Sequence, residues 1–290
     1  MGLFDSLKRD RKAAETVKSN EEPIVIENTT YEDDIVIEDI EVVEREVVPE
    51  VEKDIPLKPI KSFKDKAPVK HVVGQTKVMA IINQKGGVGK TTTCVNLAAA
   101  LKALDRRILV CDFDPQANTT SGFGVDKTAS SPSIYDVLID GADCRKAIVP
   151  TVWADVIPSN KALAGATVEM IGMSRREYLL KDALAPFHEE YDYIFVDCPP
   201  SLELLTLNAL CAADTILVPV QCEYYALEGL SDLLSTIRIV KRSLNPDIDL
   251  EGVVLTMFDG RTNLSMQVAE EVKRHFPGKV YATVIPRNVR

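Results

Sequence analysis

The chain has 290 residues, of which 46% are hydrophobic and 27% charged, and a formal net charge of −10. This length suits one domain of about 200 residues with an extension. No apolar run approaches the roughly 18 residues that cross a bilayer, and charge from Asp5 onward interrupts any secretory signal. The six cysteines contain no CxxC pair, so we expect reduced core thiols in a cytosolic protein.

The first 14 residues have the pattern of a short amphipathic helix. Its apolar face carries Leu3, Phe4 and Leu7, and basic residues stand at positions 8, 9, 11 and 12. A helix of this kind binds only weakly to a membrane surface, because about three turns bury little apolar area. We predict weak membrane association through residues 1–12, with a frayed or partner-binding end as the alternative.

Residues 15–76 differ in composition from the rest of the chain. Between Glu15 and Asp54, fifteen acidic and three basic residues give a net charge of −12. Prolines follow at positions 56, 59 and 68. Such a segment buries too little apolar surface to offset the entropy cost of ordering, so we predict a disordered acidic linker. As an alternative, its two short apolar runs pair transiently as strands or dock on a partner.

A strand, a glycine-rich turn and a helix follow one another from residue 78. An apolar run leads into KGGVGKTT at positions 85–92, and apolar residues then recur with helical spacing. This order is the context that a phosphate-binding loop requires. The glycines let backbone amides approach phosphate oxygens, and the N-terminal end of the helix attracts the same anion. We expect Lys90 to bind the β and γ phosphates and Thr91 to ligate Mg²⁺. The predicted nucleotide-binding residues of the loop are Lys85, Gly86, Gly87, Val88, Gly89, Lys90, Thr91 and Thr92.

Two further apolar runs end in carboxylates. Residues 108–111 lead to Asp112 and Asp114, and a second run leads to Asp197. Ligands bind at the carboxyl ends of strands in open parallel sheets. Asp197 is therefore placed like a Walker B aspartate, while Asp114 is also suited to cap the turn that follows it.

From residue 77 onward, strands and helices alternate as a doubly wound parallel sheet requires. Most of the predicted strands are continuously apolar, which is expected where helices cover both faces. The predicted fold class is therefore α/β, with a doubly wound, mostly parallel sheet. The predicted strands are residues 78–82, 108–112, 155–158, 193–197, 215–220, 252–257 and 280–285. The predicted helices include residues 90–104, 175–189, 202–212, 227–243 and 264–275.

These motifs together resemble the deviant Walker ATPases of the ParA/MinD superfamily. Lys85 matches the lysine that, in this superfamily, reaches the ATP phosphates of the partner subunit; a solvated loop lysine is the alternative. Residues 112–116 (DFDPQ), 218–229 and 285–290 are similar to blocks of the ParA or Soj-like partition branch. We therefore predict a ParA-type ATPase domain over residues 77–290. The family pattern normally continues past the last residue, so we expect this domain to lack the family's C-terminal end.

The resemblance implies a Mg²⁺-dependent ATP hydrolase that forms a homodimer around ATP. Phosphoryl transfer to water needs charge neutralisation and an in-line nucleophile. The two lysines of the loop serve the first need, and the resemblance places Asp114 near the attacking water. The residues implied for catalysis are Lys85, Lys90, Asp114 and Asp197, those for the metal are Thr91, Asp114 and Asp197, and Asp112 is a candidate for either carboxylate role.

The resemblance also implies binding of nonspecific DNA in the ATP state, through Arg261 and Arg290, and release on hydrolysis stimulated by a ParB-like partner. Pro286 and Asn288 would border the adenine. A net charge of −10 opposes DNA binding, but residues 251–290 hold six Lys or Arg against four Asp or Glu. The implied location is the cytoplasm, on the nucleoid.

Two other classes of protein share the lysine-bearing loop. A MinD-like membrane-associated positioning ATPase would use the N-terminal helix as its anchor. An electron-transfer ATPase similar to the nitrogenase iron protein would need cysteines that bridge an iron–sulfur cluster between subunits, and Cys198 is the candidate position.

Overall fold

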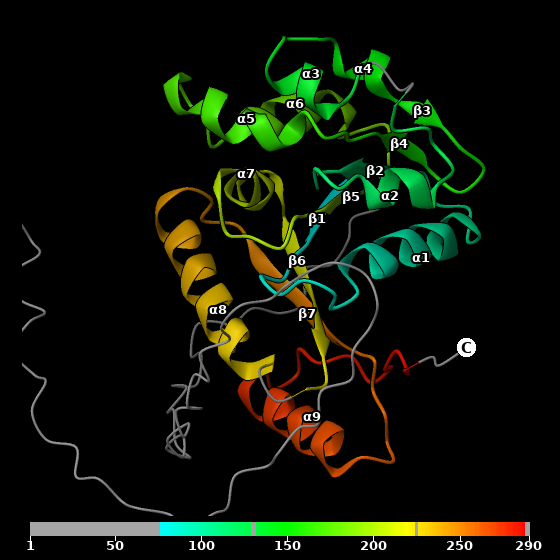
Figure 1. The fold of residues 1–290 in the computed structure, drawn as a ribbon, viewed down its shortest axis with the longest axis vertical. Helices are drawn as coiled ribbons and strands as arrows, with labels where there is room; N and C mark the ends of the chain where they lie inside the picture. The colour runs from blue at the N-terminus through cyan, green and yellow to red at the C-terminus, as the bar shows by residue number, and fades with distance from the viewer. Residues whose placement is uncertain (1–75, 129–131, 224–225, 288–290) are drawn as a thin grey trace, which may run out of the picture. The chain divides into compact units, whose positions relative to one another are not determined.

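The computed structural model describes residues 76–128, 132–223 and 226–287, without the side chains of residues 227, 228 and 231 (Figure 1). The predictions for the N-terminal helix and for residues 15–75 of the linker fall outside these residues, as do those for Asn288 and Arg290. The described part begins at Thr76, whose backbone N–H donates to the carbonyl of His188 at 3.1 Å.

Seven strands of the described residues form one sheet in the order β3-β4-β2-β5-β1-β6-β7. Neighbouring strands are parallel, except that β3 pairs antiparallel with β4 at one edge. The strands are β1 (Lys77–Ile81), β2 (Ile108–Asp112), β3 (Val149–Pro150), β4 (Asp155–Ile157), β5 (Tyr193–Asp197), β6 (Thr215–Gln221) and β7 (Asp249–Thr256).

Helices connect these strands. The α-helices are α1 (Lys90–Lys102), α2 (Asn118–Gly122), α3 (Ile134–Leu138), α4 (Cys144–Ala147), α5 (Leu163–Glu169), α6 (Leu179–Leu184), α7 (Leu204–Ala212), α8 (Ala226–Ser243) and α9 (Asn263–His275), and two 3₁₀ turns are η2 (Met170–Gly172) and η3 (Ala185–Phe187). Within the described ranges, no helix has the length and apolar character needed to cross a membrane.

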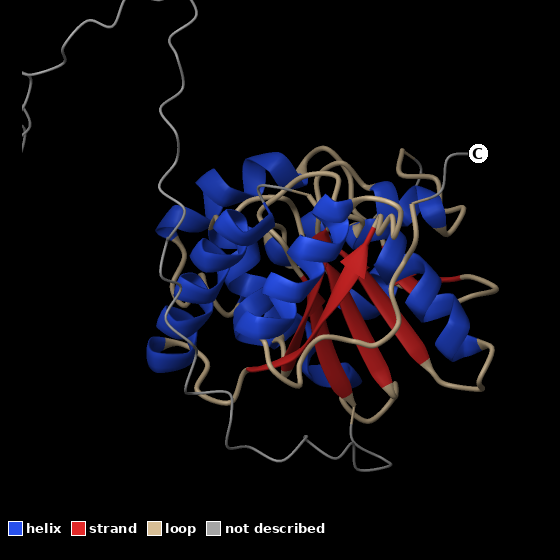
Figure 2. Ribbon diagram, turned by 90° about the horizontal axis from the view of Figure 1, so that it is seen from below, coloured by secondary structure: helices blue, strands red, loops and turns tan. Residues whose placement is uncertain are grey.

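Successive residues of the central strands face opposite sides of the sheet. In β1, Val78 and Ala80 belong to one apolar core, and Met79 and Ile81 belong to another. The first core is shared with α3 to α9, and the second with α1 and the segment after α2. Helices accordingly lie on both sides of the strands (Figure 2). Covered faces explain the apolar strands, and the predicted doubly wound α/β class is confirmed.

The predicted strand at residues 280–285 is wrong. This segment runs beside β7 but pairs with β7 and the residues just after it only through two isolated bridges, Val253 with Val280 and Phe258 with Pro286. Between the bridges, the Ile285 N–H donates to the Leu255 carbonyl at 2.8 Å. A run of β-branched residues therefore follows the sheet edge without forming a continuous ladder.

The predicted helix at residues 175–189 is shorter than expected. Its α-helical part is α6, which gives way to the 3₁₀ turn η3. Pro186 lies in that turn and has no backbone N–H to donate to a carbonyl one helical turn earlier. The apolar periodicity continues through the turn, because Leu184 and Phe187 are both buried in the larger core.

Candidate functional site

The loop between β1 and α1 has the shape of an anion cradle. Gly87 and Gly89 have φ of 74° and 91°, a region that glycine adopts without strain. A Cβ atom added at Gly86 or Gly87 would meet nothing within 4 Å, so the backbone there faces open space. The loop opens directly into α1, whose N-terminal amides favour negative charge. The predicted phosphate loop therefore has room for phosphate oxygens.

Lys90 is the buried cation of this cradle. It is 7% exposed, and its Nζ atom donates to the Lys85 carbonyl at 3.1 Å. Burial lowers the pKa of the Lys90 ammonium, and the charge of Asp197 opposes that shift. A buried cation beside a carboxylate and an open loop is the arrangement expected for a lysine that binds phosphate.

Asp197 ends β5 at the same edge of the sheet and is 1% exposed. Its Oδ2 atom accepts hydrogen bonds from the hydroxyls of Thr91 at 2.7 Å and Thr119 at 2.6 Å. Its buried Oδ1 atom has no hydrogen-bond partner among the described residues. Burial raises the pKa of Asp197 to about 6, although both threonine hydroxyls favour the ionised form.

These oxygens fit a magnesium site. Mg²⁺ prefers hard oxygen ligands and is commonly bound by one or two protein oxygens, substrate phosphates and waters. Asp197 offers the unpartnered Oδ1, and Thr91 of the phosphate loop offers a hydroxyl that is bonded to Oδ2 of the same carboxylate. A buried carboxylate oxygen without a donor is costly, and a cation or its bound water would relieve that cost.

Asp112 and Asp114 follow β2 on the neighbouring strand end. Asp112 is fully buried, and its Oδ2 atom accepts from the Thr120 backbone N–H at 2.7 Å and from its hydroxyl at 2.6 Å. Burial raises the pKa of Asp112 to about 7. Asp114 Oδ1 accepts from the backbone N–H of Gln116 at 2.9 Å, so Asp114 caps the turn after it, as one interpretation of the sequence expects. This cap leaves the second carboxylate oxygen of Asp114 for another role.

Lys85 turns toward β6. Its Nζ atom forms an ion pair with the Glu223 carboxylate, just past the end of that strand, and the two side chains are 36% and 34% exposed. Its backbone N–H donates to Asn83 Oδ1 at 2.9 Å, and Asn83 in turn donates to the Pro219 carbonyl at 2.7 Å. Lys85 is therefore held by an ion pair within its own subunit.

Two more of the predicted contact residues, Pro286 and Arg261, belong to the described part of the chain and follow β7 in the sequence. Thr256 at the end of this strand donates to the Val88 carbonyl of the phosphate loop at 2.8 Å. Pro286 forms an isolated parallel bridge with Phe258, two residues past the end of β7. Arg261 is exposed and forms a two-pronged ion pair with Asp259, at 2.8 and 2.7 Å. These bonds lower the pKa of Asp259 to about 2.

The cysteines do not fit an iron–sulfur site. All six are free thiols with buried side chains. Cys198 is fully buried, and its Sγ atom lies 3.6 Å from the Val196 carbonyl. Burial raises its pKa well above the ordinary value. A cluster bridging two subunits needs thiolates at the surface, so this burial argues against the electron-transfer alternative.

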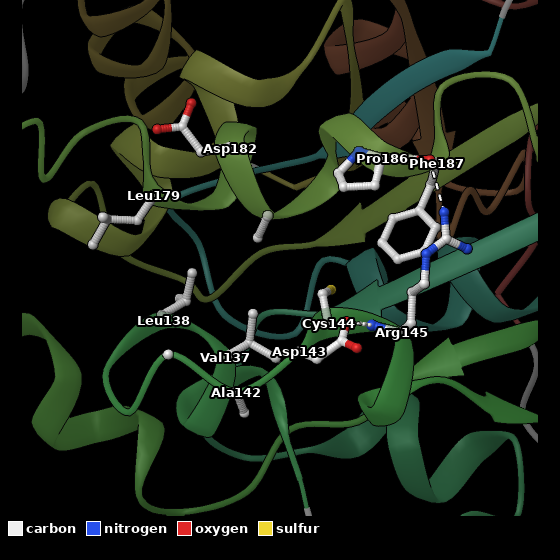
Figure 3. A pocket seen from close by; sticks show the side chains of 12 residues that line it. Val137, Leu138, Ala142, Asp143, Cys144, Arg145, Leu179, Asp182, Pro186 and Phe187 are labelled. Atoms are coloured by element: carbon white, nitrogen blue, oxygen red, sulfur yellow. Dashed lines mark hydrogen bonds between the residues drawn. The ribbon is translucent and has the colours of Figure 1, made fainter.

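A separate pocket of about 340 Å³ lies between α3, α4 and α6 (Figure 3). Figure 3 shows Arg145 against the Phe187 ring, whose centroid is 5.1 Å from the guanidinium carbon. Arg145 is also paired with Glu190. None of the residues that line this pocket belongs to the phosphate loop, so the pocket is not the nucleotide site.

Sequence reasoning missed Thr119, Thr120 and Glu223 as members of the site. All three follow strand ends at the carboxyl edge of the sheet, and this position is the signal that pointed to Asp197. Their partners are distant in the chain, however: 78 residues separate Thr119 from Asp197 and 138 separate Glu223 from Lys85. The pairing follows from the strand order, which single motifs do not show.

A phosphate loop, a buried lysine, a metal-competent carboxylate and an open parallel sheet define a P-loop nucleotide-binding protein. A family model described as an AAA domain, AAA_31, matches residues 76–250. The sporulation initiation inhibitor protein Soj of Bacillus subtilis is 56% identical over 216 residues, which are 74% of this chain and 85% of that protein. The chromosome partitioning protein ParA of Myxococcus xanthus is 51% identical over 74% of this chain and 76% of its own length. The chain belongs to the ParA/Soj family of chromosome-partitioning ATPases.

A solved structure agrees with this assignment of the fold. The crystal structure titled cobyrinic acid a,c-diamide synthase from Mycobacterium smegmatis, with bound ADP and magnesium, aligns with a TM-score of 0.70 and 41% identity. The alignment covers 74% of this chain and 88% of that chain. That related protein binds a nucleotide together with magnesium.

Proposed function

We propose that this protein is an ATP-driven partition switch: ATP is bound between two subunits, the resulting dimer binds nonspecific DNA, and hydrolysis releases it. The observation that carries the proposal is the convergence of Lys90, Thr91, Asp114 and Asp197 on the open phosphate loop. Family membership supports a ParB-like partner that stimulates hydrolysis and a location on nucleoid DNA.

In the hydrolytic step, the chain's own residues bind and orient. The loop amides and Lys90 would hold the phosphates, and Thr91 and Asp197 would hold Mg²⁺, which would supply positive charge against the phosphate oxygens. Asp114 orients the attacking water with the carboxylate oxygen that its turn does not use. Pro286 and Asn288 border the base. These roles require the carboxylates to be ionised, and binding of a cation favours the ionised form.

Lys85 is assigned a role between subunits. Within one subunit it pairs with Glu223, and in the dimer it would leave that carboxylate for the partner's ATP phosphates. A phosphate carries more negative charge than a carboxylate, so the exchange is favourable. The mutant Lys85→Ala should keep nucleotide binding by the monomer and lose ATP-dependent dimerisation.

DNA contact is assigned to Arg261 and Arg290. The Arg261 side chain is 84% exposed, and its partner Asp259 competes with phosphate for it. Water and salt weaken an ion pair at the surface, so a DNA phosphate can displace Asp259. The acidic N-terminal segment, with its net charge of −12 over residues 15–54, is expected to weaken DNA binding at low salt.

The test is the electrophoretic mobility of a nonspecific duplex with ATP, with ADP and without nucleotide, for wild type, Lys85→Ala and Arg261→Ala. Arg175→Ala is the matched control, because Arg175 is also an exposed arginine paired with an aspartate, Asp182, and lies in a different part of the fold. We expect a shift that needs ATP, is lost in the first two variants and is kept in the control. An equal shift with ATP and ADP would reject the switch.

A further inference from the structure

Two consecutive threonines at the start of α2 bind two different buried carboxylates. Thr119 donates to Asp197 and Thr120 donates to Asp112, each at 2.6 Å, and both threonines are fully buried. The helix follows the Asp114 turn after a residue in left-handed conformation, Ala117, with φ of 53°. One short helix therefore contacts both strand ends that carry the acidic residues of the site.

The two oxygens of Asp197 have different surroundings. Two hydroxyls, from Thr91 and Thr119, converge on Oδ2, while Oδ1 is buried without a donor. Rotation of a carboxylate about its last torsion is soft, so hydrogen bonds decide which oxygen faces which group. With both donors in place, the orientation of the carboxylate is fixed.

We propose that Thr119 is a positioning residue for the metal: its hydroxyl bonds Asp197 Oδ2 beside the Thr91 hydroxyl and so fixes the orientation in which the carboxylate meets Mg²⁺ or its bound water. This inference rests on the proposed Mg·ATP site. Thr91 is itself a metal ligand in that site, so its hydroxyl serves two partners. The Thr119 hydroxyl, in contrast, has the Asp197 carboxylate as its partner and is not expected to bind the metal. Thr119 lies in α2, which follows the turn at Asp114.

A hydrogen bond donated to a metal-binding carboxylate matters because it sets the direction in which the carboxylate meets the metal. Losing one typically costs 10-fold to 100-fold in metal affinity or activity. Since Asp197 keeps the Thr91 donor, we expect the lower end of that range. Loss of the Thr119 hydroxyl should weaken binding of Mg²⁺ and leave metal-free binding of the nucleotide unchanged, because Thr119 is not part of the phosphate loop.

The experiment measures binding of a fluorescent non-hydrolysable ATP analogue to the full chain as Mg²⁺ is raised, and separately in EDTA. Thr119→Val has the same shape as threonine but no hydroxyl, and Thr119→Ser restores the hydroxyl. Thr215→Val is the control for deleting a buried hydroxyl, because Thr215 is 3% exposed and its hydroxyl has no partner among the described residues.

We expect the Mg²⁺ midpoint to rise about tenfold in Thr119→Val, with the affinity in EDTA unchanged and the midpoints of Thr119→Ser and Thr215→Val close to wild type. A wild-type midpoint in Thr119→Val overturns the inference, as does an equal rise in Thr215→Val or in Thr119→Ser. If wild type itself binds the analogue without any dependence on Mg²⁺, the proposed function fails together with the inference.

Discussion

Replacing Asp112 by asparagine should change the pH dependence of stability. Asp112 is fully buried, and burial raises its pKa from 3.8 to about 7. Asparagine keeps an oxygen that can accept from Thr120 and carries no charge. Its amide group would replace only Oδ1, which accepts a long bond of 3.3 Å from the Asp114 N–H. The substitution therefore removes the titration at a small structural cost.

The direction in which the free energy of unfolding changes with pH follows from how many protons the folded and unfolded states bind. Between pH 4 and pH 7 the folded state binds the Asp112 proton and the unfolded state does not, so the wild-type free energy of unfolding falls as pH rises through this window. Each pH unit corresponds to about 1.4 kcal/mol. From pH 5.5 to the pKa near 7 is about 1.5 units, so the stability of Asp112→Asn relative to wild type should increase by about 2 kcal/mol between pH 5.5 and pH 8.

The assay is urea unfolding followed by circular dichroism at pH 5.5 and pH 8, in EDTA and without nucleotide. The lower pH stays above the sequence pI of about 5.0, where solubility falls. Asp247→Asn, at an exposed position, is the control and should show the same difference from wild type at both pH values. If the two curves for Asp112→Asn and wild type change in parallel with pH, the carboxylate is already ionised in the fold and the reasoning is refuted.

Three further outcomes test the packing of the site. Gly252→Ala should destabilise the domain by about 1–3 kcal/mol in urea unfolding, because its Cβ would lie 2.6 Å from the Tyr281 ring and 2.9 Å from the Lys279 carbonyl; unchanged stability would show that the segment after α9 does not pack on β7. Thr256→Val should weaken analogue binding by up to about tenfold through loss of its bond to the Val88 carbonyl, whereas Thr256→Ser should bind like wild type. The six thiols should react with a disulfide reagent only on unfolding, and fast labelling of native protein would contradict their burial.

The sequence predicted the parts of the fold that depend on local pattern. The strand before the glycine-rich loop, the helix after it and β5 with its terminal Asp197 follow from contiguous local patterns, and each is confirmed as an element. The strand predicted at residues 280–285 failed because an apolar run does not by itself show a continuous hydrogen-bond ladder, and this segment meets the chain of β7 only at isolated bridges. The ion pair between Lys85 and Glu223 could not be predicted from the sequence for a different reason. It depends on β1 and β6 being neighbours in the sheet, and local sequence patterns do not show which strands are neighbours.

A second set of neighbouring strands explains how α2 can hold the Asp114 turn in place. Strands β4, β2 and β5 are neighbours, and their carboxyl ends deliver Ser159, Asp112 and Asp197 in that order. The Ser159 N–H donates to the Thr120 hydroxyl at 3.0 Å, which in turn donates to Asp112, while Thr119 donates to Asp197. A shift of α2 would break bonds to all three strand ends at once. The turn at Asp114 is thus fixed on both sides: by Asp112 at the end of β2 before it, and by the hydrogen bonds of Thr119 and Thr120 after it.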